Sequence, residues 1–227
     1  MAKRKLLKIQ DRHALFDIPT DEDSLIRRYF LSSADRLEIE VRRREHNRLG
    51  FAVQLCLMRY PGRPLLANET PPRAMLNYVA EQIGADPASF GLYARREETR
   101  MNHVAHLLDY LGMSGPTAED RRAALLAAIE AAAATDKGAT IATAIITTFR
   151  ERRVLLPAAN MIERMGLAAR AIARRQAEAA LITDLDPETL GTLDGLLAVD
   201  PAIGQTRYHW LRSAPEVLRL RALRLLA

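Results

Sequence analysis

The sequence predicts an all-α fold of multiple helices, arranged as two helical subdomains with helix-turn-helix-like elements. The first observation is composition: aromatic residues make up only 5% of the 227 residues, and Ala, Leu and Arg dominate, which favours helices over β-sandwiches or barrels. Second, 48% of the residues are hydrophobic and 27% are charged, as in folded globular proteins. Third, helix-start signals recur ahead of segments whose apolar residues have helical spacing.

The first two helices are expected early in the chain. Thr20 can serve as an N-cap ahead of an acidic first turn, which predicts a short helix over residues 25–31. Ser33 is expected to cap the next helix, over residues 34–45. Apolar and polar residues alternate in that stretch, a period that also suits a strand. We prefer the helix and leave the strand open.

Residues 47–60 are expected to form a central buried helix. Nearly every position in this segment is apolar, as a helix surrounded by others requires, and Pro61-Gly62 ends it. Cys56, the one cysteine of the chain, falls inside the segment. No disulfide within the chain is therefore possible, and a buried thiol is the expectation.

Two further helices follow a proline-rich loop at residues 63–72, and the first of them ends at Gly84. Asp86-Pro87 then combines an N-cap with a proline at the first helical position, ahead of a long helix over about residues 95–111. The inner face of the first helix is expected to consist of Met75, Leu76, Val79 and Ile83.

The helix over residues 95–111 has two distinct faces. The apolar face, expected to pack inward, consists of Met101, Val104, Leu108 and Leu111. The basic face, expected to contact phosphate, consists of Arg95, Arg96, Arg100 and His103. Because Glu97 and Glu98 can neutralise these cations locally, a solvated face with intrahelical ion pairs is an equal alternative.

The best candidate boundary is the Gly-, Ser- and Pro-containing stretch at residues 112–117. It predicts one subdomain over residues 1–113 and a second over residues 114–227. Thr117 and Asp120 have the spacing of a capping box. The helices expected beyond the boundary cover residues 118–134, 139–153, 157–181, 187–199, 208–212 and 215–226. Asp186-Pro187 and Asp200-Pro201 are interpreted as further start signals.

The charge balance limits the partners. Lys and Arg total 33 against 28 Asp and Glu, a net charge of +5, which hints at a polyanionic partner. The basic N-terminus lacks the apolar segment and cleavage site of a secretory signal. No stretch approaches the roughly 20 apolar residues of a membrane span. We therefore expect a cytoplasmic protein without a membrane role.

The first candidate for nucleic-acid binding is the junction between two predicted helices, where Arg42, Arg43 and Arg44 precede Asn47 and Arg48. The planar fork of arginine binds phosphate or guanine, and asparagine can pair with adenine. Because glutamates flank these cations, a solvated helix face is an equal alternative. A structural role also stays open, in which Asn47 caps the buried helix and Arg48 pairs with the preceding Glu45.

A further basic patch lies near the C-terminus, around Arg207 and Arg212. Trp210 lies inside it and could stack on bases, although a role in the core is the preferred interpretation for a lone tryptophan at helical spacing.

Metal and catalytic chemistry find little support. Only His103 and His106 are neighbours among the five histidines, without the spacing of a zinc protease helix or a cysteine pair. There is no glycine-rich phosphate loop, and no predicted sheet to hold the carboxylates of two-metal phosphoryl transfer. We therefore expect no cofactor, no metal site and no catalytic residue.

Several strings of residues resemble one family. Residues 42–62, RRREHNRLGFAVQLCLMRYPG, closely resemble the opening signature of class II replicative transposases, the Tn-three family. Later blocks continue the resemblance in the same order. They are residues 78–84, Tyr93 to His103, Leu155-Leu156-Pro157 with Ile162-Glu163-Arg164, and Trp210-Leu211-Arg212 with Pro215.

The resemblance implies N-terminal helical domains that recognise the terminal inverted repeats of a transposon, and a C-terminal RNase-H-like domain that cleaves and joins strands. Since the chain ends at Ala227, we expect it to lack that catalytic domain and not to be an enzyme. The expected partner is double-stranded DNA at transposon ends, and self-association stays open. The expected DNA contacts are Arg42, Arg43, Arg44, Asn47, Arg48, Arg59, Arg95, Arg96, Arg100, His103, Arg207 and Arg212.

Two other functions compete with this interpretation. A helical protein–protein module of a transposition complex would bind no specific DNA sequence, and the Ala-rich helices of the second half suit such packing. A free-standing nuclease would cut DNA in the presence of magnesium, which we do not expect.

Overall fold

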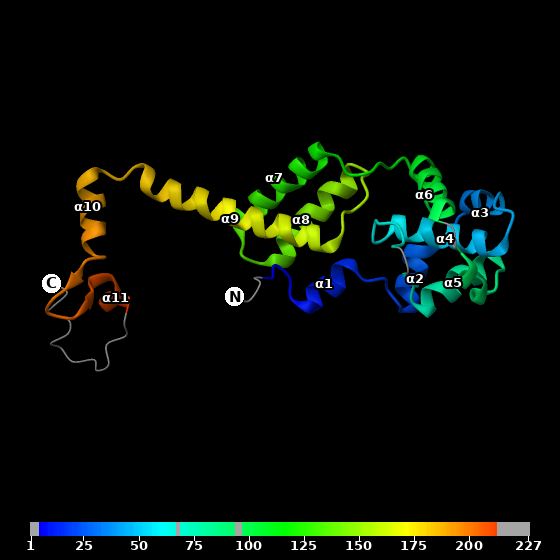
Figure 1. Ribbon diagram of the computed structural model, residues 1–227, viewed down its shortest axis with the longest axis horizontal. Helices are drawn as coiled ribbons and strands as arrows, with labels where there is room; N and C mark the ends of the chain where they lie inside the picture. Colours follow the sequence, from blue (N-terminus) through cyan, green and yellow to red (C-terminus); the bar gives the residue numbers. More distant parts are fainter. Residues whose placement is uncertain (1–4, 67–68, 94–96, 213–227) are drawn as a thin grey trace. The chain divides into compact units, whose positions relative to one another are not determined.

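The computed structural model describes residues 5–66, 69–93 and 97–212, and it confirms the all-α prediction (Figure 1). The chain divides into two compact units, residues 1–175 and residues 176–227. Within the described residues, none of the helices combines the length and apolar character that crossing a membrane requires. The first unit contains α1 (Ile9–Phe16), α2 (Glu22–Tyr29), α3 (Ser33–Glu40), α4 (Glu45–Arg59), α5 (Arg73–Ile83), the 3₁₀ helix η1 (Pro87–Leu92), α6 (Glu97–Leu111), α7 (Ala118–Ala134), α8 (Gly138–Glu151) and most of α9 (Ala159–Thr183).

α4 is the centre of the first hydrophobic core. Every residue from Leu49 to Met58 is buried, and α2, α3, α5, η1 and α6 pack around it (Figure 1). Gly50 is required where α4 meets Tyr93, because a Cβ would overlap the tyrosine ring. The prediction of a central buried helix is confirmed. So is the buried thiol, since Cys56 is fully enclosed and burial raises its pKa to about 12.

α7, α8 and α9 form a second hydrophobic core. Phe149 of α8 and Ile162 of α9 lie in it, together with Leu6 and Leu7 from the segment before α1. α1 accordingly lies beside α8 (Figure 1). Gly166 makes room for this segment, because a Cβ there would overlap the Leu6 side chain.

The two cores lie largely on either side of residues 112–117, which connect α6 to α7. Leu6 and Leu7 nevertheless join the core of the later helices, and Leu155 joins the core around α4. The division into subdomains over residues 1–113 and 114–227 stays a prediction.

The helix starts show both confirmed and wrong predictions. α2 is capped by Asp21, whose carboxylate accepts from the Ser24 amide at 3.0 Å, and not by Thr20. α3 is capped by Ser32, and not by Ser33, because Ser32 forms a reciprocal capping box with Asp35. The equivalent box predicted for Thr117 and Asp120 is confirmed at the start of α7. The alternation in residues 34–45 is helical, but α3 ends at Glu40.

The predicted faces of α6 are correct only in part, since Val104, Leu108 and Leu111 pack against the core around α4 as expected. Met101, assigned to the inward face, is 63% exposed, whereas His103 and Leu107 are the buried residues of the described helix. The reason lies in the neighbours of His103. Its ring meets Phe51 edge-on, with centroids 5.2 Å apart, and stacks on Tyr93 at 5.6 Å. A polar aromatic ring with a hydrogen-bond partner thus takes the inward position that apolar spacing assigned elsewhere.

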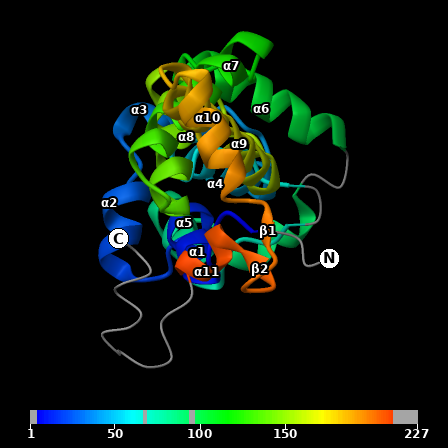
Figure 2. The ribbon, with the colours of Figure 1, turned by 90° about the vertical axis from the view of Figure 1, so that its left-hand side faces the viewer.

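The second unit begins within α9 and continues through α10 (Pro187–Gly195), a two-stranded antiparallel ribbon of β1 (Val199–Asp200) and β2 (Gln205–Thr206), and α11 (Arg207–Arg212) (Figure 2). The ribbon corrects two predictions. The helix expected over residues 187–199 ends at Gly195, and Asp200-Pro201 begins a turn between strands instead of a helix. The Asp200 carboxylate accepts from the Ala202 amide at 2.9 Å, which favours the turn. Trp210 is only partly buried, and the helix expected over residues 215–226 lies outside the described residues.

Candidate nucleic-acid interface

The junction between α3 and α4 exposes only the tip of α4. Four residues, 41–44, connect the two helices, and Arg44 has the extended backbone of an N-cap (φ −116°, ψ 140°) without a side-chain cap. From Leu49 onward the helix is buried. α4 therefore cannot lie lengthwise in a DNA groove as a recognition helix does. Its first turn and the preceding loop are the parts that can touch a ligand.

The cations at this tip have no partner within the described residues. Arg43 and Arg44 are exposed, while Asn47 and Arg48 are partly buried, and their side chains make no hydrogen bond or ion pair there. The structure contradicts the two alternative roles, in which Asn47 caps α4 and Arg48 pairs with Glu45. The N-cap is Arg44, and the Glu45 carboxylate accepts from the Asp86 amide at 2.6 Å instead of pairing with Arg48.

Arg42 differs from its neighbours because it turns inward. Its guanidinium stacks over the Phe51 ring, with Cζ 4.3 Å from the centroid. Its Nε and Nη2 atoms are buried without a hydrogen-bond partner. A cation–π contact of this kind ties the junction loop to α4, so Arg42 helps to hold the position of the exposed arginines after it.

Arg48 lines a small open cleft of about 280 Å³ between α3, α4 and α5. Arg36 also reaches the cleft and donates to the Gln82 carbonyl at 2.6 Å. Arg36 and Gln82 were not among the predicted site residues, because residues 46 positions apart carry no local signal of their contact. Glu40 supplies a negative charge to the same wall, so the cleft as a whole is mixed in charge. The residues that line it are Arg36, Ile39, Glu40, Arg48, Gln82, Ile83 and Gly84.

Arg59, at the other end of α4, is neutralised. Its guanidinium forms a bidentate pair with Asp35, at 2.8 and 2.5 Å, and the Tyr110 hydroxyl donates to the same carboxylate at 2.9 Å. The Asp35 side chain is fully buried. Its burial alone would raise its pKa, but the hydrogen bonds from Arg59 and Ser32 outweigh burial and lower the pKa to about 2. This pair fastens α3 to α4.

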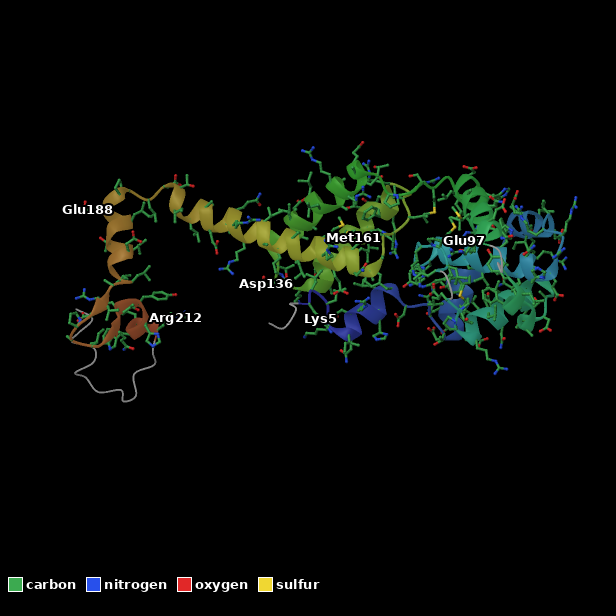
Figure 3. The ribbon with its side chains drawn as sticks, in the orientation of Figure 1. Lys5, Glu97, Asp136, Met161, Glu188 and Arg212 are labelled. Atoms are coloured by element: carbon green, nitrogen blue, oxygen red, sulfur yellow. The ribbon has the colours of Figure 1, made fainter. Side chains whose placement is uncertain are left out.

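Of the predicted basic face of α6, the structure describes Arg100 and His103, and both contact other parts of the first unit. Arg100 pairs with Glu97 at 3.0 Å and also donates to the Leu65 carbonyl. Glu97, at the start of α6, is labelled in Figure 3. His103 is buried beside the Tyr93 hydroxyl, 3.1 Å from its Nδ1. Burial, followed by the charge of Arg42, lowers its pKa to about 4, so the ring is neutral near pH 7. Arg95 and Arg96 lie outside the described residues.

Arg207 and Arg212, the two arginines of the second unit that the structure describes, both have local contacts. Arg207 pairs with Asp200 at 3.2 Å. Arg212, labelled in Figure 3, lies over the Tyr208 ring, with Cζ 5.6 Å from the centroid. Both are exposed, and weak surface pairs of this kind do not prevent a cation from engaging a phosphate.

Comparison with known proteins gives the family. Residues 6–169 match the family described as a domain of unknown function, DUF4158. The chain is 38% identical over 215 residues to the transposase for transposon Tn501 of Pseudomonas aeruginosa, and 37% identical to the transposase for transposon Tn21 of Escherichia coli. The transposase for transposon Tn1546 of Enterococcus faecium is 32% identical.

These alignments cover 93 to 95% of the chain but 22% of each relative. The chain thus spans about a fifth of the length of the relatives it matches. With most of its length matched by the domain model, the chain belongs to the DUF4158 family and is a relative of these transposases.

Proposed function

We propose that the chain is the DNA-binding N-terminal region of a transposase and recognises the terminal inverted repeats of a transposon through the α3–α4 junction. The observation that carries the proposal is a contrast in ion pairing between the cations of the junction and Arg59, which pairs with Asp35 at the other end of α4. Arg43, Arg44 and Arg48 stand beside Asn47 at an exposed helix tip, and none has a carboxylate partner within the described residues. Together with the names of the relatives, this supports duplex DNA as the proposed partner.

The mechanism divides positioning from reading. Arg43 and Arg44 contact phosphates, which gives an affinity that falls with salt because counterions are released. Asn47 and Arg48, on the first turn of α4, reach base edges and select the repeat. The uncapped amides at this helix start add a favourable field for a phosphate.

The structure refines the set of proposed contacts. Arg42, Arg59, Arg100 and His103 support the fold around the junction, since each packs against or pairs with other parts of the first unit. Arg207 and Arg212 belong to the second unit and would make separate contacts. Strand cleavage and joining are assigned to the other four-fifths of the relatives' length, so the proposed region binds DNA without a cofactor and does not cut it. We place its action in the cytoplasm.

A mobility-shift titration tests the proposal. The chain is titrated into an inverted-repeat duplex and into a scrambled duplex of equal length and composition, each at two salt concentrations. We expect tighter binding to the repeat, and weaker binding to both duplexes at the higher salt. Negligible binding to both duplexes contradicts DNA recognition. Equal, salt-sensitive binding to both leaves only a non-specific role.

A protein–protein module is the second candidate, and the second unit favours it. Large apolar side chains there are exposed, including Leu181 at 76%, Val199 at 64% and Leu197 at 61%, and exposed apolar side chains in number mark interaction surfaces. Sedimentation velocity over a range of concentrations distinguishes this function. Self-association of the chain without any shift of a duplex would favour the module over the DNA-binding region.

A further inference from the structure

Two arginines from distant helices meet on one tyrosine ring at the C-terminal end of α4. The Cζ atom of Arg28, in the last turn of α2, lies 3.5 Å from the centroid of the Tyr60 ring. The Cζ atom of Arg150, in the last turn of α8, lies 5.6 Å from the same centroid. Because both distances start from the same point, the two guanidinium carbons can be no farther apart than their sum.

No carboxylate pairs with either arginine within the described residues. Other arginines of the first unit do have carboxylate partners: Arg59 pairs with Asp35, Arg63 with Glu69, and Arg152 with Asp120 and Glu119. Arg28 has no hydrogen-bond partner there, and Arg150 donates only to the Pro61 carbonyl, at 3.1 Å. The Tyr60 hydroxyl is also without a hydrogen-bond partner in the described part of the chain.

The arrangement places two like charges close together. Burial lowers the pKa of Arg150, and the positive charge of Arg28 lowers it further. The hydrogen bond to the Pro61 carbonyl fixes Arg150 and leaves its other donors free. Stacking on the ring orients Arg28 in the same way. Two pre-positioned forks and a free phenol hydroxyl match the several acceptor oxygens of one phosphate group.

We propose that Arg28, Tyr60 and Arg150 form a second phosphate-binding site, which holds one phosphodiester of the DNA backbone. This source of the phosphate rests on the proposed DNA-binding function. The α3–α4 junction lies at the start of α4 and the new site at its end, and a helix of 15 residues is about 22 Å long. Contacts at both ends of a rigid buried helix would set the register of the junction on the duplex.

The test compares a double variant, Arg28→Gln with Arg150→Gln, with a double control, Arg122→Gln with Arg164→Gln. The control removes two exposed arginines whose side chains form no hydrogen bond or ion pair with the described residues. Duplex affinity is measured against salt. We expect the double variant to lose affinity for repeat and scrambled duplexes by the same factor, and the slope of log K on log salt to fall by about one. A slope and affinity equal to those of the control overturn the proposal.

Single neutral methylphosphonates placed along the repeat locate the contact. For the unaltered protein, one position should weaken binding, and the same substitution should have no further effect on the double variant. Circular dichroism and a thermal melt establish that the double variant is folded. Arg28→Gln alone, at an exposed position of α2, gives the same readout if the double variant does not fold.

Inorganic phosphate, titrated by calorimetry into the unaltered protein and the double variant, separates this inference from the proposed function. If the unaltered protein binds no duplex, but binds phosphate in a manner that the double variant loses, the site exists and takes a free phosphate. If it binds duplex while the double variant is indistinguishable from the control, the site is wrong and the proposed function stands. Binding of neither ligand overturns both.

Discussion

The two ends of α4 carry the same residue type in opposite electrostatic settings. At the start of the helix, Arg43, Arg44 and Arg48 have no carboxylate partner within the described residues, and Arg43 and Arg44 are exposed. At the end, Arg59 is locked in a bidentate pair with the buried Asp35. The difference shows that a count of arginines says little about binding. An arginine paired with a buried carboxylate contributes to folding, whereas an unpaired arginine remains available to a polyanion.

Among the variants that test this comparison, Arg59→Met is expected to have the largest effect on stability. The change leaves the Asp35 carboxylate buried without its cation, which should lower the free energy of unfolding by about 3–4 kcal/mol. Urea denaturation measures it. The affinity of the folded variant for duplex should remain unchanged. A stable variant with weakened DNA binding would instead make Arg59 a DNA contact.

Acid sensitivity is the next largest effect and concerns His103. Its pKa is about 4 in the folded state, against 6.5 for an unperturbed histidine. Because the folded-state pKa is depressed, its contribution to stability is complete above pH 6.5 and is lost as the pH falls towards 4. The loss amounts to about 2–3 kcal/mol. Denaturation midpoints between pH 7 and pH 4 should fall less steeply for His103→Gln than for the unaltered protein, and equal slopes would contradict burial of a neutral ring.

Asn47→Ala is expected to act on selectivity alone. If Asn47 reads a base edge, its loss should reduce the preference for the repeat over a scrambled duplex by about tenfold, within the 1–3 kcal/mol of a bidentate base contact. Competition titrations with both duplexes give this ratio. Preserved preference with reduced stability would assign Asn47 a purely structural role.

The smallest effect on folding should come from Arg43→Gln. An exposed arginine without partners changes the free energy of unfolding by no more than about 0.5 kcal/mol. The salt slope of duplex binding should nevertheless fall by about one. Arg59→Met is expected to do the opposite, with a large loss of stability and an unchanged affinity for duplex. An unchanged slope would remove Arg43 from the interface.

Local signals in the sequence predicted most of the fold. The capping box at Thr117 and the buried character of residues 49–58 each depend on neighbours a few positions apart, and both were confirmed. On α6, Met101 and His103 were assigned to the wrong faces, because spacing alone could not show that Phe51 and Tyr93 provide a place for the His103 ring.

The candidate site was predictable only in part. The cations at residues 43–48 are adjacent in sequence and therefore visible as a cluster. Whether a cation is neutralised depends on partners far along the chain, such as Asp35 for Arg59, 24 positions away. The meeting of Arg28 and Arg150 on Tyr60 depends on the packing of three helices and leaves no pattern in the sequence.

The most direct measurement is duplex binding by a triple variant that carries Arg43→Gln, Arg44→Gln and Arg48→Gln. Its charge-matched control changes the exposed Arg122, Arg164 and Arg175 to glutamine. We predict that the junction variant stays folded, loses measurable preference for the inverted repeat, and shows a salt slope lower by about two to three, while the control binds like the unaltered protein apart from a small general loss. A junction variant that binds the repeat as well as the control does would contradict the assignment of the α3–α4 junction as the DNA-binding surface.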